Sequence, residues 1–403
     1  MKTKIISLLL LTLMLCLSLS SCLLFDIVGA DTEEPEIVGN VNVNVGEVNN
    51  HQITINSTAT EGELAATKAL MSAVSIRTDS ASGSGVIFKM SEDKSEAYIL
   101  TNYHVVYDSA TGKVSKNIKA YLYGMESHLY GDKSFDYSMK ARYLGGTMEY
   151  DLAVLKVTAS PILMGSVARA CDFADSNKVT VLETAMAVGN AAGAGISVTV
   201  GRINVDSETI SLLASDERTP LSLRVMRTDA AVNSGNSGGG LFNAAGELIG
   251  IVNAKSAGSG TDNIGYAIPS NVAKYIAENI IYYCDGGSGE KNAYKCLLGI
   301  NVEIAELYSE LDSESGMLVR KEKVKVKEIT SMASAAYGKL KEGDVINSIQ
   351  IDGKEYEVTR MFHVTDAMLN ARVNSSVVVK VTRNGEVKDI AITFKASDIS
   401  KVS

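Results

Sequence analysis

Residues 227–239 read Arg-Thr-Asp-Ala-Ala-Val-Asn-Ser-Gly-Asn-Ser-Gly-Gly, and this stretch sets Ser237 between glycines on both sides. Glycines before a serine let the backbone bend sharply, so that successive N–H groups point into one concavity. Such a concavity can hold the negative oxygen that develops when a hydroxyl attacks a carbonyl carbon. A serine hydroxyl alone is a poor nucleophile, so the stretch indicates catalysis only if a base and an orienting carboxylate lie elsewhere. Taken alone, the stretch is as typical of a glycine-rich β-turn as of a catalytic loop.

His104 is the candidate for the base among the four histidines. It lies in a β-rich run, residues 97–106, and residues 83–88 upstream are predicted to form the partner strand of a hairpin. A lone histidine in a strand is more often structural than catalytic, so His104 needs support from other segments. The remaining histidines lie in polar stretches or in a separate C-terminal module: His51, His128 and His363.

Asp151 is the candidate for the orienting carboxylate. It stands at the start of the apolar run Leu152-Ala153-Val154-Leu155, which is typical of a buried strand. An unpaired charge at the mouth of a buried strand would be costly, so we expect Asp151 to have a partner.

The candidates occur in the order His104, Asp151, Ser237, which is the chain order of the chymotrypsin triad. Together, the segments around them resemble the HtrA/Deg family of trypsin-like serine proteases. Further segments match in register: Val188-Gly189-Asn190, Thr199-Val200-Gly201-Arg202-Ile203, Gly246-Glu247-Leu248-Ile249-Gly250-Ile251 and Asn263-Ile264-Gly265-Tyr266-Ala267-Ile268-Pro269. The resemblance implies a mainly β chain, with a chymotrypsin-like double six-stranded β-barrel followed by a PDZ domain.

The resemblance also implies roles for individual residues. His104, Asp151 and Ser237 would form the catalytic triad. The oxyanion hole would use the N–H groups of Gly235 and Ser237, with Asn236 assisting. In trypsin-like folds the primary specificity pocket has its base six residues before the nucleophile. The expected pocket residues are therefore Ala231, Ile251, Val252 and Asn253, which carry no charge, so the sequence predicts cleavage after small or medium aliphatic residues.

Four features depart from the family. Gly240 stands where proline is usual after the nucleophile loop, and Ser234 where proline or arginine is frequent. Ala191-Ala192-Gly193 replaces the usual Pro-Phe-Gly. Residues 26–75 contain no Phe, Tyr or Trp, whereas family members often form trimers through aromatic side chains in this region. The sequence therefore leaves undecided whether the chain forms a homo-oligomer, and the resemblance does not imply a trimer.

The N-terminus resembles a bacterial lipoprotein signal. Lys2 and Lys4 precede an apolar run that is shorter than a membrane-spanning helix, and this run ends at Leu19-Ser20-Ser21-Cys22. We expect residues 1–21 to be the signal peptide and Cys22 to carry the lipid. The expected location is thus the bacterial cell envelope, lipid-anchored on the extracytoplasmic side of the membrane. A cleaved secretory signal without lipid is the alternative.

Composition divides the mature chain into four parts. Residues 22–62 are polar and predicted to be a flexible tether. Residues 63–284 are predicted to be the protease domain, with a leading helix over residues 63–75 and a last helix over residues 270–283. Residues 285–293 are expected to be a linker, and residues 294–399 a PDZ domain. In that domain, Leu298-Gly299-Ile300 would present N–H groups to peptide C-termini, and the next strand would accept a peptide by strand addition.

Charge and cysteine content exclude other classes of site. The formal net charge of −9 argues against a nucleic-acid partner, which needs clustered cationic surface. The cysteines show no CxxC pair and no clustering with histidine, so we expect no metal site, and nothing points to a cofactor. Cys284 and Cys296 could pair across a glycine-rich loop, which spacing alone does not decide.

The sequence thus favours an envelope-anchored serine endopeptidase that cleaves exposed or misfolded polypeptides through an acyl-enzyme. The alternative is a chaperone-like scaffold of the same fold that binds unfolded peptides with little hydrolysis. The intact Ser, His and Asp set favours the enzyme, since a scaffold has no reason to keep three separated catalytic side chains.

Overall fold

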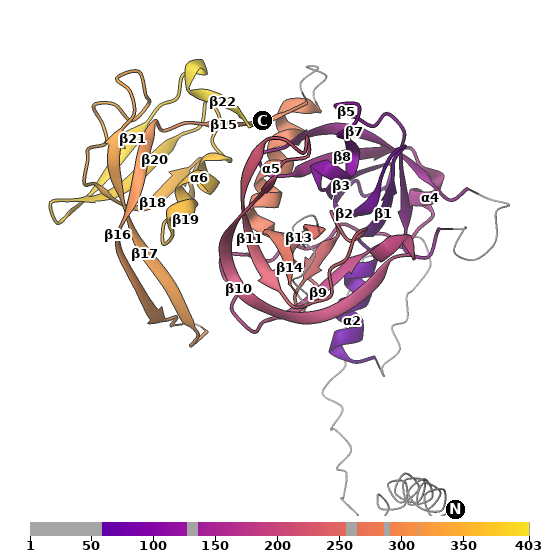
Figure 1. Ribbon diagram of the computed structural model, residues 1–403. Helices are drawn as coiled ribbons and strands as arrows, with labels where there is room; N and C mark the ends of the chain where they lie inside the picture. Colours follow the sequence, from indigo (N-terminus) through magenta and orange to yellow (C-terminus); the bar gives the residue numbers. More distant parts are fainter. Residues whose placement is uncertain (1–58, 127–135, 255–263, 286–290, 314, 403) are drawn as a thin grey trace, which may run out of the picture. The chain divides into compact units, whose positions relative to one another are not determined.

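Two closed antiparallel barrels, a long helix and a C-terminal sheet make up the described part of the chain (Figure 1). The computed structural model describes residues 59–126, 136–254, 264–285, 291–313 and 315–402. From Thr60 onward the chain forms one compact unit. The double six-stranded barrel expected from the sequence is confirmed.

The first barrel has the strand order β1–β2–β3–β8–β7–β6 and closes because β1 also pairs with β6. The predicted hairpin is confirmed, since β2 pairs antiparallel with β3. The short helix α3 (Tyr103–Val106) and the small pair β4 (Tyr107–Asp108) and β5 (Lys113–Val114) connect β3 to β6, whereas the short helix α4 (Pro161–Met164) follows β8 and leads to the second barrel. The strands are β1 (Ala73–Arg77), β2 (Ser82–Met90), β3 (Glu96–Thr101), β6 (Ile118–Leu122), β7 (Met139–Thr147) and β8 (Leu152–Thr158).

The second barrel has the order β10–β11–β14–β13–β12–β9 and closes through the pairing of β9 with β10. Its longest hairpin, β10–β11, turns at residues 214–219. The strands are β9 (Thr184–Gly189), β10 (Ser197–Leu213), β11 (Pro220–Thr228), β12 (Gly240–Phe242), β13 (Leu248–Val252) and β14 (Gly265–Pro269). The turn η3 (Ala191–Gly193), which replaces Pro-Phe-Gly, joins β9 to β10.

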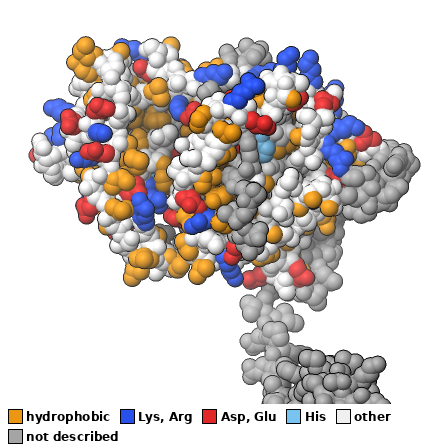
Figure 2. All heavy atoms as spheres, viewed as in Figure 1, with side chains coloured by type: hydrophobic (Ala, Val, Ile, Leu, Met, Phe, Trp, Pro, Cys, Tyr) orange, Lys and Arg blue, Asp and Glu red, His pale blue; other side chains and the backbone are white. Residues whose placement is uncertain are grey.

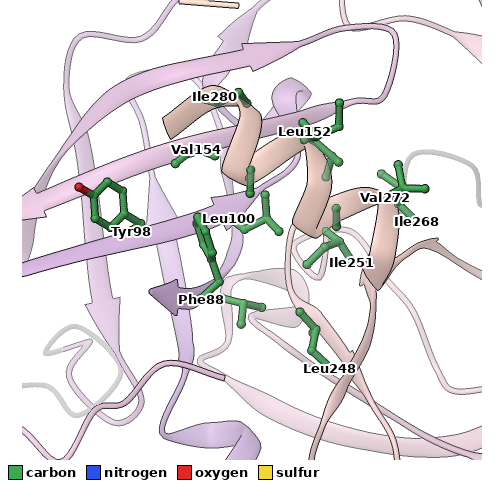
Figure 3. Packing of buried hydrophobic residues seen from close by; sticks show 14 of the residues in the cluster. Phe88, Tyr98, Leu100, Leu152, Val154, Leu248, Ile251, Ile268, Val272 and Ile280 are labelled. Atoms are coloured by element: carbon green, nitrogen blue, oxygen red, sulfur yellow. The ribbon is translucent and has the colours of Figure 1, made fainter. Parts of the chain in front are cut away.

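Alternating side chains of the barrel strands enter different cores. In β8, Ala153 and Leu155 fill the interior of the first barrel, whereas Leu152 and Val154 face outward into a second apolar cluster. That alternation follows from the two-residue period of a strand. The second cluster joins the two barrels to helix α5 (Ser270–Cys284), as Figure 3 shows for Leu100, Leu248, Ile251, Ile268, Val272 and Ile280.

The leading helix differs from the prediction. Helix α2 runs from Glu61 to Leu70 and ends before Ser75, which lies in β1. It starts at a capping box, in which the Thr60 side chain accepts the Glu63 N–H and the Glu63 carboxylate accepts the Thr60 N–H. The residues after Leu70 favour a helix by composition, so the prediction continued the helix to Ser75, whereas in the structure β1 begins at Ala73.

The C-terminal module is a sheet in the order β16–β17–β18–β20–β21, with β19 also paired to β18 and α6 (Met361–Met368) beside it. The predicted strand pair around Asn384-Gly385 is confirmed as β20 and β21. A separate pair joins β15 (Ala293–Cys296) to β22 (Ile399–Val402), after the turn η5 (Ala396–Asp398). The sheet strands are β16 (Ile300–Leu311), β17 (Leu318–Ile329), β18 (Val345–Ile351), β19 (Lys354–Glu357), β20 (Val377–Arg383) and β21 (Glu386–Ile392).

The pairing of Cys284 with Cys296 does not occur. Neither cysteine is in a disulfide and both are buried; Cys284 Sγ contacts the Asn292 carbonyl, whereas Cys296 belongs to the apolar core of the C-terminal module. No helix in the described ranges has the length and apolarity needed to cross a membrane. On the face that Figure 2 shows, acidic and basic side chains of the described residues are interspersed.

Candidate active site

Three chain segments bring the predicted triad together at the ends of barrel strands. His104 lies in α3, directly after β3. Asp151 immediately precedes β8 and has the left-handed φ of +49°, which is uncommon for a residue with a side chain. Ser237 lies in the loop before β12. Backbone strain of this kind is found where the surrounding structure fixes a functional side chain.

The Asp151 carboxylate is buried, with 2% of the side chain exposed, and accepts four hydrogen bonds. His104 donates twice, from its backbone N–H to Oδ1 at 3.0 Å and from ring Nδ1 to Oδ2 at 2.6 Å. Ser215 Oγ donates to Oδ1 at 3.2 Å, and Asn253 Nδ2 donates to Oδ2 at 2.9 Å. Charge-assisted donors on both oxygens offset the cost of burying the carboxylate, so the partner expected for Asp151 is present.

The histidine ring is held in one tautomer by this contact. An ionised carboxylate only accepts, so Nδ1 of His104 carries the proton and Nε2 is left with a lone pair. The main chain on both sides is fixed as well: Asn102 Nδ2 and Tyr103 N–H both donate to the Asp151 carbonyl, at 2.9 and 3.1 Å. The His104 side chain is 19% exposed, so the ring is partly accessible from solvent.

Ser237 Oγ accepts the N–H of Ala254 at 3.3 Å. Among the described residues it makes no hydrogen bond to His104. In proteins without bound substrate, catalytic hydrogen bonds are often long and tighten only when substrate is present. The serine and the base thus lie in neighbouring segments, but their direct contact is not formed in this state.

The loop around Ser237 requires glycine at two positions, one on each side of the serine. Gly235 has a φ of +97°, and a Cβ there would lie 2.2 Å from the Asn190 carbonyl oxygen. Gly238 has a φ of +83°, and a Cβ there would lie 2.2 Å from Thr101 Oγ1. Both positions combine a left-handed backbone with contact to a neighbouring segment, which only glycine tolerates.

The N–H groups of Gly235 and Ser237 have no hydrogen-bond acceptor among the described residues. The N–H of Asn236, in contrast, donates to the Asn233 carbonyl at 3.0 Å. Two unpaired N–H groups two residues apart are suited to hold an oxyanion. Asn236 does not assist with its backbone, which corrects that part of the expectation.

The four residues expected to line the specificity pocket lie in different environments. Ala231 is exposed, and its carbonyl accepts the Thr199 hydroxyl at 2.9 Å. Ile251 is fully buried in the cluster between the barrels, and Val252 in the core of the second barrel. Asn253 binds Asp151. Ile251 and Val252 are therefore core residues, because these two consecutive side chains point to opposite faces of β13 and both faces are buried. Asn253 supports the triad.

The predicted peptide-binding turn lies at the start of β16. Leu298 is buried in the core of the C-terminal module and Ile300 is half-buried. Gly299 has a φ of +72°, and a Cβ there would lie 2.1 Å from Ser334 Cβ. In the sheet order, β16 pairs only with β17, so its other edge has no partner strand among the described residues.

Of the remaining histidines the structure describes His363, which does not join the site. Burial lowers the pKa of His363 to about 4, with the nearby Arg224 and Arg360 acting in the same direction. Its Nδ1 accepts the Thr359 N–H. His51 and His128 lie outside the described residues, as do Cys22, residues 1–21 and most of the predicted tether.

Sequence reasoning missed Ser215 and misassigned Asn253. Ser215 lies in the turn of the β10–β11 hairpin, where serine is common, so no local pattern sets it apart. Asn253 follows an apolar strand near the expected pocket, and only the packing of the two barrels shows that its amide reaches Asp151. Neither contact could be read from spacing, since each joins residues more than sixty positions apart.

Comparisons with known proteins agree with this geometry. Residues 83–251 match the family model of the trypsin-like peptidase domain. The chain is 31% identical to Serine protease Do-like HtrA of Bacillus subtilis over 315 residues, which cover 77% of this chain and 62% of the relative. It is 30% identical to Serine protease Do-like HtrA of Lactococcus lactis subsp. cremoris, covering 79% of this chain and 72% of the relative.

A solved structure is also similar: the HtrA-type protease AlgW with tripeptide has a TM-score of 0.50 and 27% identity. The match covers 82% of this chain and 95% of AlgW. The chain spans about three fifths of the length of the Bacillus subtilis relatives that it matches.

Proposed function

The chain belongs to the HtrA family of serine proteases, and we propose that it is an endopeptidase that cleaves exposed or misfolded polypeptides through an acyl-enzyme. The observation that carries the proposal is the buried Asp151 carboxylate, which fixes the His104 tautomer beside a serine loop with two unpaired N–H groups. This arrangement supplies the base, the nucleophile and the oxyanion donors of acyl transfer.

The reaction runs in two halves. Ser237 Oγ bonds to the scissile carbonyl carbon while His104 Nε2 takes its proton, and the carbonyl oxygen becomes the oxyanion facing the N–H groups of Gly235 and Ser237. The intermediate collapses, the C–N bond breaks, and His104 returns the proton to the leaving amine. Water then repeats the attack on the acyl-enzyme with the same base. Asp151 stays ionised and stabilises the imidazolium throughout.

The C-terminal module is proposed to be a PDZ domain that binds peptide C-termini or extended segments. Leu298-Gly299-Ile300 forms the turn that would hold a terminal carboxylate, and the unpartnered edge of β16 would take an added strand. Substrates are thus unfolded or misfolded polypeptides, and nucleic acid is not a partner.

The first prediction concerns Ser237. In the chain lacking residues 1–22, Ser237→Ala should lower the turnover of casein by about four or more powers of ten, because the nucleophile and the proton transfer are lost together. The wild-type chain should carry a fluorophosphonate label on Ser237 alone. If the wild-type chain binds unfolded casein but degrades it no faster than Ser237→Ala does, the chaperone-like alternative holds instead.

The second prediction concerns the residue on the acyl side of the cut bond. Ala231 offers no charge, and the nearby Asp229 is turned away, since its Oδ1 accepts the Arg202 N–H at 2.6 Å. A buried ammonium or guanidinium would find no counter-charge from either residue. Cleavage sites mapped by mass spectrometry in a denatured protein should therefore follow mainly Val, Ala, Ile or Leu, with a selectivity of roughly tenfold among them. A majority of cuts after Lys or Arg would contradict this pocket.

The third prediction concerns Cys22, which we propose carries diacylglycerol and anchors the chain on the extracytoplasmic face of a bacterial membrane. The basis is the short apolar run that ends in Leu19-Ser20-Ser21. Cys22→Ala should release the protein from the membrane fraction or leave the signal uncleaved, as seen by fractionation and intact mass. Cys16→Ala is the matched control and should change neither. Membrane-bound wild-type protein that retains Met1 and has no lipid on Cys22 would rule out the anchor.

A further inference from the structure

Ser84, in β2, is fully buried at the junction between the first barrel and the nucleophile loop. Its Oγ donates to the Gly235 carbonyl at 2.7 Å and accepts the Asn190 N–H, also at 2.7 Å. Its backbone N–H donates to the Ser237 carbonyl at 2.8 Å, and its own carbonyl accepts Thr101 Oγ1 at 2.7 Å. One residue of the first barrel thus holds two carbonyls of the loop that carries the nucleophile.

The direction of the Gly235 N–H depends on how the neighbouring carbonyls are held. In a trans peptide the C=O and the N–H point in opposite directions, so a donor that fixes the Ser234 carbonyl also aims the Gly235 N–H. That donor is the Ala192 N–H, at 2.7 Å. Ala192 lies in η3 with a φ of +54°, a conformation that has to be held in place by its surroundings.

The Ser84 hydroxyl joins the two segments on which this alignment depends. It binds Asn190, the residue directly before η3, on one side, and Gly235, directly after Ser234, on the other. The Asn190 side chain closes the same turn, because its Oδ1 accepts the Gly195 N–H at 2.8 Å. The Ser84 hydroxyl therefore supports the direct Ala192–Ser234 hydrogen bond by holding the residues next to it in both segments.

Ser84 lies close to the backbone of Gly189 and Gly238. A Cβ on Gly189 would lie 2.8 Å from Ser84 Oγ, and a Cβ on Gly238 would lie 2.3 Å from the Ser84 carbonyl oxygen. Replacing the hydroxyl by hydrogen would leave a buried N–H and a buried carbonyl without their partner, and only a group that both donates and accepts can serve the two.

We infer that Ser84 is a positioning residue for the oxyanion site: its hydroxyl ties η3 to the nucleophile loop and so keeps the Gly235 N–H aimed at the reacting carbonyl oxygen. The inference rests on the proposed function. Ser84 does not touch the substrate and acts through Gly235 and Asn190. It should therefore affect the stability of the transition state and hardly affect the binding of the ground state.

The test compares Ser84→Ala, Ser84→Thr and Ser72→Ala in the full-length chain. Ser72 is the matched control, since it is also a fully buried serine, and its hydroxyl donates to the Ala69 carbonyl at 2.9 Å, outside the site. Hydrolysis of a fluorogenic peptide gives kcat and KM. Inhibition by a peptide that ends in a valine aldehyde reports on the oxyanion site, because Ser237 Oγ adds to the aldehyde carbon, passes its proton to His104 and generates an oxyanion.

Ser84→Ala should lower kcat by about 10- to 100-fold and should weaken aldehyde inhibition by a similar factor. This decrease should not exceed the decrease in kcat that follows removal of a complete oxyanion-hole donor. KM should stay within about twofold, since ground-state contacts are unchanged. Ser84→Thr keeps the hydroxyl and should recover most of the loss. Ser72→Ala should retain wild-type kcat, with an unfolding midpoint close to that of Ser84→Ala.

Equal kcat and equal aldehyde inhibition in Ser84→Ala and Ser72→Ala would overturn the inference while leaving the proposed function intact. Wild-type hydrolysis that does not depend on Ser237 would instead overturn the proposed function, and the inference with it. If Ser84→Ala fails to fold, Ser84→Cys takes its place, because a thiol keeps the shape and weakens both hydrogen bonds. A Ser84→Cys protein with unchanged kcat and aldehyde inhibition would count against the inference in the same way.

Discussion

The rest of the site depends on the burial of one carboxylate. Asp151 can stay ionised with 2% of its side chain exposed only because donors reach it from several sides. His104 comes from the first barrel, whereas Ser215 and Asn253 come from the second. The two barrels must therefore close on each other before the charge is satisfied. The hydrogen bonds that orient the catalytic base therefore form only when the two barrels are docked.

A second junction links the barrels through the nucleophile loop. Ser84 and Thr101, from adjacent strands of the first barrel, contact the segment that runs from Gly235 to Gly238. The apolar cluster with α5 brings the same barrels together from another side. The hydrogen bonds and close contacts of the nucleophile loop thus lie next to an apolar interface, and burial of that interface stabilises the association of the two barrels. The loop can therefore keep its strained backbone, which depends on glycine.

Much of the fold could be predicted from sequence, because hairpins and amphipathic helices leave local patterns. The pairing of β2 with β3, helix α5, and the turn at Asn384-Gly385 are examples. Contacts across the barrels left no such pattern. Ile251 was expected in a pocket and lies in the core, and Ser215 was not singled out at all. A strand sequence shows that alternate residues differ in environment, but when both faces are buried it does not say which core each residue enters.

The most direct measurement is a crystal structure of the wild-type chain after reaction with a peptidyl phosphonate, whose phosphoryl oxygen takes the place of the oxyanion. Phosphorus should be bonded to Ser237 Oγ, with the phosphoryl oxygen within hydrogen-bond distance of the N–H groups of Gly235 and Ser237. The Ala254 contact to Ser237 Oγ should be lost, and His104 should face the serine. A phosphoryl oxygen that meets the Ser234 carbonyl in place of the Gly235 N–H, or phosphorus bonded to another residue, would contradict the account.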